Sequence, residues 1–425
     1  MGRWLYSVLV YLLLPLVLVQ LWYRGFSDSR YRRGLAERLG YPAPAPEPGG
    51  LWVHAASVGE AIAATPVIEG LRAAFPGRAL VVTTMTPTGA ERIRARFADS
   101  VFCCYIPFDA PHIINRFLAR VRPRILVIME TELWPNLVHG CGRQGIPVVL
   151  ANARMSERSE TGYARLRVLS RPLFSRLDWV AAQAGPDAQR FRRLGVAAER
   201  LTVTGSIKYD VTIDPASRES AGALRRECGL NRAVWIGAST HEGEDEQLLQ
   251  AHEQLLEERP DALLILVPRH PERFESVYRA IRRRDLAVAR RSRSQSPRDG
   301  SVYLADTMGE LVMLFGAADV AFIGGSLIER GGHNPLEAAA WSLPVLSGPH
   351  IFNFTSVFER LESEQGMREV CDAASLTGAL CELFADVEAR TRMGHNARAV
   401  VAANRGAVER LVHGISERVP GSAIT

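Results

Sequence analysis

The sequence is almost without lysine and lacks the short motifs by which many enzymes hold phosphate or metal. Lys208 is the only lysine, so the other 50 of the 51 Lys and Arg residues are arginines. No GxxxxGK[ST] occurs, which excludes a P-loop, and no GxGxxG directly follows a strand-like run, so a dinucleotide oxidoreductase has little support. No HExxH or DxD occurs either. A site for anionic groups must therefore use backbone amides, helix dipoles and cations.

Cysteine is also scarce, and its spacing excludes the common metal sites. None of the six cysteines forms a CxxC, and no His/Cys cluster has zinc spacing. We therefore expect a reduced, cytoplasmic chain with structural cysteines and no metal site. We expect the loop-proximal histidines to be hydrogen-bonding residues rather than metal ligands; they are His54, His241, His270 and His333.

Bulk composition indicates a folded chain of more than one domain. Hydrophobic residues make up 47% and charged residues 23% of the 425 residues, which excludes disorder. The net charge of +5 does not require nucleic acid, and we expect no nucleic-acid partner. The arginine-rich stretch from Arg279 to Arg298 indicates a solvated helix end and loop, with an acidic-lipid contact as the alternative.

A single long apolar run, Trp4 to Tyr23, predicts an N-terminal membrane anchor. Its 20 residues are about what a bilayer core requires, and aromatic residues stand at both ends. The arginines that follow it place the bulk of the chain on the cytoplasmic side. A buried core helix is the alternative, and the run leaves open whether the helix spans the bilayer or lies in one leaflet. These arginines are Arg24, Arg30, Arg32, Arg33 and Arg38.

Short apolar runs that alternate with helical patterns predict two doubly wound α/β domains. We place the anchor at 1–25, the first domain at 26–215, the second at 216–390, and a C-terminal helix that packs back on the first domain at 391–425. The runs of the first series are Leu51–His54, Ala79–Thr84, Arg124–Met129, Pro147–Ala151, Trp179–Gln183 and Leu201–Thr204. Those of the second are Ala233–Ile236, Leu263–Val267, Ser301–Leu304, Val320–Ile323 and Leu343–Leu346.

In the second half, polar residues after the strands are candidates for binding an anion. Arg269 directly follows the apolar run that ends at Pro268, where a bidentate guanidinium suits phosphate or carboxylate. Asn334, Pro335 and Leu336 resemble a helix start, and Glu337 could either close a capping box or accept ribose hydroxyls. A second helix start, with amides free to face phosphate, is expected at Gly309, Glu310 and Leu311.

In the first half, three acidic residues are candidates for proton transfer. Glu60 follows a turn of small residues, where it could partner a helix dipole or serve as a general base. Glu130 and Glu132 flank Thr131, and we expect them to point to opposite sides, so that one could enter a cleft while the other supports the fold.

Nine segments in order resemble one known family. HAASVGE, TTMTPTG, METELWPN, ANARMS, GSIKYD, STHEGE, PRHPER, DTMGEL and GGSLIERGGHNPLEA together are similar to bacterial 3-deoxy-D-manno-octulosonic acid (Kdo) transferases of lipopolysaccharide synthesis. The resemblance runs from the anchor to about Leu411. It implies a GT-B fold of two facing Rossmann-like domains behind an N-terminal inner-membrane anchor. It also implies an inverting, metal-independent enzyme without cofactor that transfers Kdo from CMP-Kdo to the tetraacyl lipid A precursor, lipid IVA.

The resemblance also implies residue roles. Glu60 matches the proton acceptor, and Glu130 and Lys208 match positions of transition-state stabilisation. The CMP-binding segments match Pro268-Arg269, Gly309-Glu310-Leu311 and Asn334-Pro335-Leu336-Glu337. Two rival functions stay open: another membrane-anchored GT-B glycosyltransferase with a UDP-sugar donor, and a membrane-tethered nucleotide-binding scaffold without catalysis.

Overall fold

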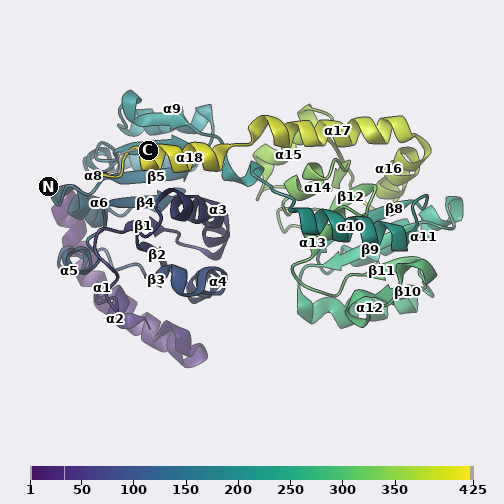
Figure 1. Ribbon diagram of the computed structural model, residues 1–425, viewed down its shortest axis with the longest axis horizontal. Helices are drawn as coiled ribbons and strands as arrows, with labels where there is room; N and C mark the ends of the chain where they lie inside the picture. The colour runs from purple at the N-terminus through teal and green to yellow at the C-terminus, as the bar shows by residue number, and fades with distance from the viewer. Residues whose placement is uncertain (1, 33, 422–425) are drawn as a thin grey trace. The chain divides into compact units, whose positions relative to one another are not determined.

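The computed structural model describes residues 2–32 and 34–421, so Arg33 of the predicted arginine group lies outside the described residues. The chain forms two compact units. Unit 1 comprises Met1–Asp210 and Gly406–Thr425, and unit 2 comprises Val211–Arg405 (Figure 1).

Unit 1 is built on a seven-stranded parallel sheet in the order β3-β2-β1-β4-β5-β6-β7. Its centre is the pair β1 and β4, in register from Leu51↔Ile125 to His54↔Ile128, where the strand order reverses. In open α/β sheets, ligands bind outside the carboxyl ends of the strands at such a point. The strands are β1 (Leu51–His54), β2 (Leu80–Thr84), β3 (Phe102–Tyr105), β4 (Ile125–Met129), β5 (Val148–Ala153), β6 (Trp179–Ala182) and β7 (Leu201–Val203).

Helices cover both faces of this sheet because the strands are apolar on both faces. Trp52 of β1 packs on one face with Phe117 and Phe174, whereas its neighbours Leu51 and Val53 pack on the other face with Leu71. The helices are α3 (Val58–Ala74), α4 (Pro87–Phe97), α5 (Pro111–Val121), α6 (Pro135–Arg143), α7 (Glu157–Arg165), α8 (Arg167–Phe174), α9 (Gly185–Leu194) and α18 (Ala407–Ser416). Short helices are α2 (Leu35–Arg38), η1 (Ser29–Tyr31), η2 (Ala98–Ser100), η3 (Ala198–Arg200) and η4 (Ile207–Tyr209).

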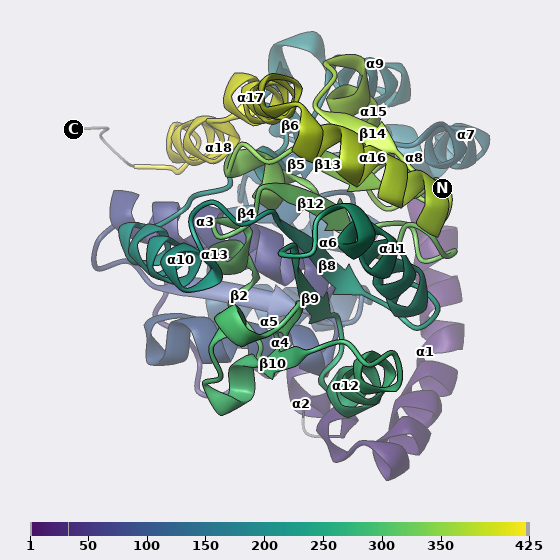
Figure 2. The same ribbon diagram turned by 90° about the vertical axis from the view of Figure 1, so that its right-hand side faces the viewer.

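Unit 2 repeats the architecture, with the strand order β10-β11-β9-β8-β12-β13-β14. In Figure 2, α11 and α12 lie on one side of its sheet and α10 and α13 on the other. The strands are β8 (Val234–Thr240), β9 (Leu263–Pro268), β10 (Val288–Arg290), β11 (Val302–Leu304), β12 (Val320–Ile323), β13 (Val345–Ser347) and β14 (Met367–Glu369). The longer helices are α10 (Pro215–Cys228), α11 (Asp245–Glu258), α12 (Phe274–Arg283), α15 (Thr355–Ser363), α16 (Ala373–Ala385) and α17 (Val387–Asn404); α13 (Leu311–Phe315) and α14 (Leu336–Ala340) are short.

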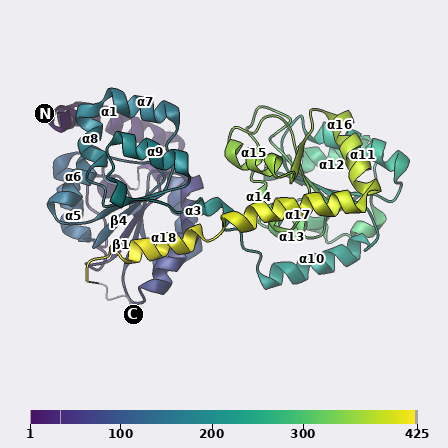
Figure 3. The same cartoon turned by 90° about the horizontal axis from the view of Figure 1, so that it is seen from above.

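The two parallel-sheet domains are therefore confirmed, but their borders differ from the predicted ones. The predicted helix at 391–425 is two helices: α17 belongs to unit 2 and α18 to unit 1, as Figure 3 shows in yellow. Helix α17 ends at Asn404, Arg405 is extended, and Gly406 turns the chain into α18 with φ of +87°. The carboxylate of Asp210 then accepts hydrogen bonds from the amides of Gly406 and Val408 at 2.5 and 2.6 Å. The borders consequently fall at 210/211 and 405/406, rather than at 215/216 and 390/391.

The predicted apolar segment is one continuous helix, α1 (Gly2–Ser27), with Pro15 inside it. It is long and apolar enough to cross a membrane by length and composition, and only 6% of its most apolar window is buried. The core-helix alternative is wrong, since a core helix would be mostly buried.

Candidate active site

Three sequence-predicted residues of unit 1 come together at the carboxyl ends of its central strands. Glu60 stands in the first turn of α3, directly after β1, and Glu130 directly follows β4. Lys208 lies in η4, which follows β7 at the edge of the sheet. A hydrogen bond from the amide of Ile207 to the side-chain oxygen of Asn152 holds η4 near the end of β5, which is closer to the centre of the sheet. Lys208 thereby comes within electrostatic reach of Glu130.

Glu60 takes the helix-start role that its sequence context left open, because its side chain and its amide both bond within the first turn of α3. Ser57 caps α3 by accepting from the Glu60 amide at 3.2 Å, and its hydroxyl donates back to the Glu60 carboxylate at 3.0 Å. The other carboxylate oxygen accepts from the Ala56 amide at 2.9 Å. Burial raises the pKa of the Glu60 carboxyl, although these hydrogen bonds act to lower it, and the charges of Glu130 and Glu132 add to the rise. A raised pKa brings a carboxylate closer to the strength that a general base needs.

Glu130 and Glu132 both lie near Glu60, so the expectation that they point to opposite sides is wrong. Residues two apart share one side of an extended chain, and the chain is not extended at Glu130. Glu130 adopts a left-handed backbone with φ of +56°, a conformation that costs a non-glycine residue on the order of 1 kcal/mol. Its amide donates to the carbonyl of Ala151 at 2.9 Å. The turn brings both carboxylates close enough to Glu60 to raise its pKa. The strained residue is thus one of the predicted site residues, which is where such strain is usually found.

Lys208 is half-buried between charges of both signs. Burial lowers the pKa of its ammonium group and the nearby Arg154 lowers it further, while Glu130 opposes both. Its surroundings contain a residue that sequence reasoning missed. Asn152 is fully buried with φ of +53°, and its side-chain amide nitrogen has no hydrogen-bond partner among the described residues. The signal was an asparagine inside the apolar run VVLANA.

The buried histidine of this unit, His54, is a structural residue. Its Nδ1 lies 3.0 Å from the hydroxyl of Thr83 and 3.1 Å from the Thr83 carbonyl, which ties β1 to β2. Burial lowers the pKa of its ring to about 4, so the ring is neutral at ordinary pH. The predicted hydrogen-bonding role of His54 is confirmed.

In unit 2, Arg269 and Glu337 lie close together after β9 and at the start of α14. The Arg269 amide donates to the carbonyl of Thr240 at 3.0 Å, whereas its exposed guanidinium makes no hydrogen bond or ion pair with the described residues. Glu337 is half-buried and hydrogen-bonds the side chain of Asn334. Burial raises the pKa of Glu337, against the hydrogen bond from Asn334 and the charge of Arg269.

The start of α14 differs from the predicted capping box. The helix begins at Leu336 rather than Pro335, and Pro335 already has helical backbone angles. The side-chain oxygen of Asn334 accepts from the Leu336 amide at 3.1 Å. Glu337 bonds to the side chain of Asn334 and not to the backbone amide of Asn334. No reciprocal capping box therefore forms.

The segment Gly309-Glu310-Leu311 precedes α13, which begins at Leu311. Gly309 needs to be glycine, since its φ is +84°. The Glu310 carboxylate is bound by the guanidinium of Arg291 at 2.5 and 2.7 Å and by the hydroxyl of Thr307, and hydrogen bonds from Arg291 lower the pKa of Glu310. The stretch 279–298 is therefore only partly solvated, because Arg291 fixes the loop before α13.

A buried carboxylate that sequence reasoning missed shapes the glycine-rich loop after β12. Glu244 is fully buried, and its oxygens accept from the amides of Gly325, Ser326 and Leu327 at 2.7–3.0 Å and from that of His241 at 3.0 Å. The only signal was its place in STHEGE, among other polar residues. Glu244 thus holds two loops of unit 2 in register.

Two of the predicted histidines meet beside this loop. The Nε2 atoms of His241 and His333 lie 2.9 Å apart, and the rings stack with centroids 5.1 Å apart. Burial, with a contribution from the charge of Arg269, lowers the pKa of each ring to about 4. No group of three or more His, Cys, Asp or Glu in residues 2–32 and 34–421 could hold a metal ion.

Comparison with known proteins gives relatives over the whole chain. Residues 33–211 match the family described as 3-deoxy-D-manno-octulosonic-acid transferase (kdotransferase). The 3-deoxy-D-manno-octulosonic acid transferase of Haemophilus influenzae is 42% identical over 416 residues, 97% of each chain. That of Bordetella pertussis is 35% identical and covers 98% of this chain and 99% of its own.

Among solved structures, UDP-GlcNAc 2-epimerase from Neisseria meningitidis has a TM-score of 0.57 at 15% identity, over 87% of this chain and all of that one. This likeness is in fold, and it agrees with two Rossmann-like units of the kind found in GT-B glycosyltransferases. The sequence identity over nearly the full length is stronger evidence, because it shows the family and not only the fold. The chain belongs to the 3-deoxy-D-manno-octulosonic acid transferase family, the Kdo glycosyltransferases of lipopolysaccharide biosynthesis.

Proposed function

We propose that the enzyme moves Kdo from CMP-Kdo to the lipid A precursor lipid IVA, with inversion at the transferred carbon. The observation that carries this proposal is the half-buried Glu60, whose pKa is raised beside Glu130 and Lys208 at the carboxyl ends of a Rossmann-like sheet. Inversion needs one base and one in-line attack, and a single carboxylate of this kind can supply the base.

On the acceptor side, Glu60 takes the proton from the sugar hydroxyl of lipid IVA. The hydroxyl oxygen then attacks the anomeric carbon of Kdo, and the bond from that carbon to the phosphate oxygen of CMP breaks. Glu130 and Lys208 stabilise the charge that develops during this exchange, and the compact ammonium of Lys208 suits the carboxylate that Kdo carries. The turn at Glu130 supports this assignment, because it places the carboxylate beside both partners.

On the donor side, CMP leaves as a phosphate monoester, and cations and backbone amides are needed to stabilise its negative charge. We assign the phosphate to Arg269, whose guanidinium is unpaired among the described residues, and the ribose hydroxyls to Glu337. Asn334, Pro335 and Leu336 contribute by setting the position of Glu337. The Glu310 carboxylate is paired with Arg291, so we propose that Gly309-Glu310-Leu311 contacts CMP through its main chain. We propose that Pro268 contributes to CMP binding by positioning Arg269.

The proposed acceptor is a lipid, and α1 supplies the means of staying near it. We place the protein at the inner membrane, with both units on the cytoplasmic face. The apolar length of α1 and the arginines that follow it support this placement. Membrane attachment keeps the acceptor close without the protein having to bury its acyl chains.

The pH dependence of transfer should report the raised pKa of Glu60. The base acts as the carboxylate, so kcat/KM is expected to fall as the pH drops through a pKa that lies above the ordinary 4.5. Glu132→Gln removes one of the like charges that raise this pKa, so it should move the acid limb to lower pH. Initial rates measured across pH with both enzymes test this, and an acid limb at or below 4.5 in the wild type would contradict it.

Arg269→Ala is expected to weaken CMP binding about 10- to 100-fold, since a hydrogen-bonded charge contributes roughly 1.5–3 kcal/mol. Arg269→Lys should restore part of the affinity, because it keeps the charge but not the planar fork. Arg279→Ala is the matched control: that side chain is 70% exposed on α12 and paired only with Glu275. Calorimetry measures all three, and unchanged CMP affinity in Arg269→Ala would remove Arg269 from the donor site.

The donor assignment itself is tested by calorimetry with CMP and UDP on the wild-type enzyme. Preferential binding of CMP is expected. Preference for UDP would overturn the donor assignment in favour of a UDP-sugar transferase.

A further inference from the structure

The outer surface of α1 carries many exposed apolar side chains, interrupted by the exposed Gln20 and Arg24. The exposed large apolar side chains occur along the whole helix and are between 36% and 74% exposed, from Trp4 at 71% to Tyr23 at 74%. Exposed apolar patches of this extent mark sites of interaction, so we expect another molecule to bind this surface. The members are Trp4, Leu5, Leu9, Tyr11, Leu12, Leu13, Leu16, Val17, Val19, Trp22, Tyr23 and Phe26.

The N-terminal turns of α1 are fastened to unit 1 by polar contacts. The side-chain oxygen of Asn136, at the start of α6, accepts from the Arg3 guanidinium at 3.1 Å and from the Ser7 hydroxyl at 3.0 Å. Asn136 is itself fixed, since its amide and side chain donate to Asp109 at 3.0 and 2.7 Å. We call Arg3, Ser7, Asn136 and Asp109 the polar clamp. One turn further on, the hydroxyl of Tyr11 lies 2.7 Å from Nδ1 of His112, on α5.

The segment that follows α1 is fastened to the same unit. Arg30 forms an ion pair with Glu91 of α4 at 2.7 Å. Glu37 accepts from the amide of Tyr105 in β3 at 2.8 Å, and Arg38 donates to the carbonyl of Met85 at 2.6 Å. Both ends of the apolar helix are therefore held against unit 1, and Figure 1 shows α1 running past α5 to α2.

Length excludes a transmembrane path for the part that is not fastened. Between Tyr11 and the end of α1, the residues from Leu12 to Ser27 number 16, which is about 24 Å of helix at 1.5 Å per residue. A bilayer core is about 30 Å thick. For all of α1 to span, the polar clamp and the Tyr11 contact would have to break and expose their buried groups.

A second apolar point lies beside the N-terminal end of α1. At the junction of α7 and α8, Leu166 is 63% and Val168 is 72% exposed. Val168 adjoins Gly2, where a β-carbon would come within 3.0 Å of the valine methyl. Exposed arginines alternate with these residues: Arg165, Arg167 and Arg171.

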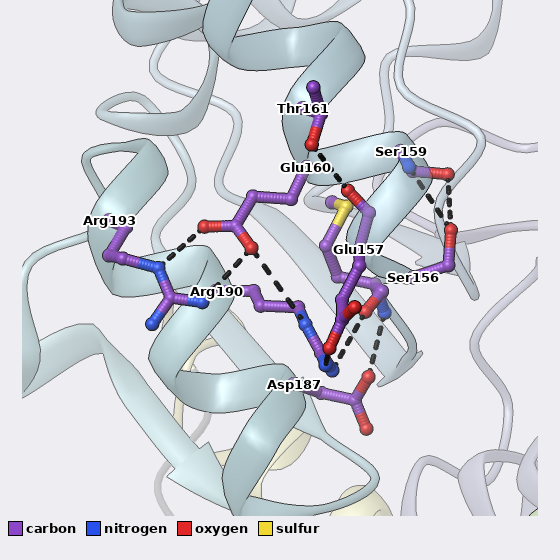
Figure 4. A network of polar contacts seen from close by, with 9 residues as sticks. Ser156, Glu157, Ser159, Glu160, Thr161, Asp187, Arg190 and Arg193 are labelled. Atoms are coloured by element: carbon purple, nitrogen blue, oxygen red, sulfur yellow. Dashed lines mark hydrogen bonds and ion pairs between the residues drawn. The ribbon is translucent and has the colours of Figure 1, made fainter.

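An ion-pair network keeps this junction in place. Glu160 of α7 accepts from Arg193 of α9 at 2.5 and 2.9 Å, and Arg190 of α9 donates to Glu157 at 2.9 Å (Figure 4). Because α7 is tied to α9 in this way, Leu166 and Val168 project from a rigid part of unit 1. Apolar side chains interleaved with arginine suit the boundary between acyl chains and anionic headgroups.

We propose that unit 1 binds one leaflet of an anionic bilayer, with α1 lying in the membrane plane and Leu166 and Val168 inserting as a second contact. The helix then anchors the chain without crossing, so its two ends remain on the same side. The two contacts together fix which face of unit 1 meets the lipid. This inference stands independently of the donor and acceptor assigned above.

Reporter fusions to the full chain test the path of α1. Green fluorescent protein fluoresces on the cytoplasmic side, and alkaline phosphatase is active on the other; each is joined before Met1 in one set and after Thr425 in a second. The second set marks the side on which the two units lie. The same readout at both ends is expected. Opposite readouts at the two ends would show a spanning helix and overturn the proposal.

Vesicle binding tests the second contact and the identity of the occupant. The purified full chain is sedimented with phosphatidylcholine vesicles that contain or lack phosphatidylglycerol. The double variant Leu166→Asp/Val168→Asp is expected to bind the anionic vesicles at least ~10-fold more weakly, while Leu230→Asp, 67% exposed in unit 2, binds as the wild type does. Equal binding by the double variant, or a wild type that self-associates and does not bind vesicles, would overturn the proposal.

Discussion

Glu60→Gln is expected to lower the rate of Kdo transfer by about 10²–10⁴-fold, the usual contribution of a general base. The amide keeps the shape of the side chain and an oxygen for the bond from Ala56, but it cannot take a proton at neutral pH. CMP affinity should be unchanged, because the residues assigned to CMP belong to the other unit. Turnover with CMP-Kdo and calorimetry with CMP measure the two quantities.

The fold of this variant should be intact. The raised pKa means that the folded chain disfavours the charged form of Glu60, so above the unfolded pKa the carboxylate costs stability that glutamine does not. A melting temperature equal to or above that of the wild type is therefore expected at neutral pH. Glu69→Gln, a surface change on the same helix, is the matched control and should keep full activity. More than about a tenth of wild-type turnover in Glu60→Gln would contradict the assignment of Glu60 as the base.

Lys208→Met is expected to lower kcat about 10²–10³-fold, the loss usually seen when one donor to a developing charge is removed. Lys208→Arg should also lose kcat, because a planar guanidinium does not replace a compact ammonium in a half-buried site beside Glu130 and Arg154. CMP affinity should change little in either variant. Single-turnover rates separate the chemical step from donor binding.

Arg92→Met is the control for Lys208, since Arg92 is an exposed cation on α4 of the same unit. Its turnover should match the wild type. Turnover of Lys208→Arg at the wild-type rate would contradict the assignment of Lys208 to transition-state stabilisation.

Much of the fold could be predicted because buried parallel strands carry a strong sequence signal. Runs such as ILVIM and LLILV are typical of strands in a sheet that is covered by helices on both faces. Polar residues directly after such runs mark the edge of the sheet where ligands bind. Three edge or near-edge strands escaped prediction. In β10 and β14 the three residues VAR and MRE include charged side chains. The third strand, β3, is the apolar run FCCY, but two of its four residues are cysteines rather than the β-branched and aromatic residues that mark strands.

The conformation of the candidate site could be predicted only in part, since it depends on contacts between distant residues. The turn at Glu130 requires a left-handed backbone at a non-glycine residue, which no local pattern indicates. The pairing of Glu310 with Arg291 joins loops 19 residues apart. The turn at Gly406 is set by Asp210, 196 residues earlier in the chain. These are tertiary effects, and a pattern within one segment does not contain them.

The central claim is that this enzyme transfers Kdo from CMP-Kdo to lipid IVA. Mass spectrometry of lipid IVA after incubation with the purified enzyme and CMP-Kdo tests it most directly. We expect lipid IVA that has gained one or more Kdo residues, with CMP as the second product and with no product from Glu60→Gln. Unmodified lipid IVA in the presence of CMP-Kdo, or glycosylation only when a UDP-sugar is supplied, would contradict it.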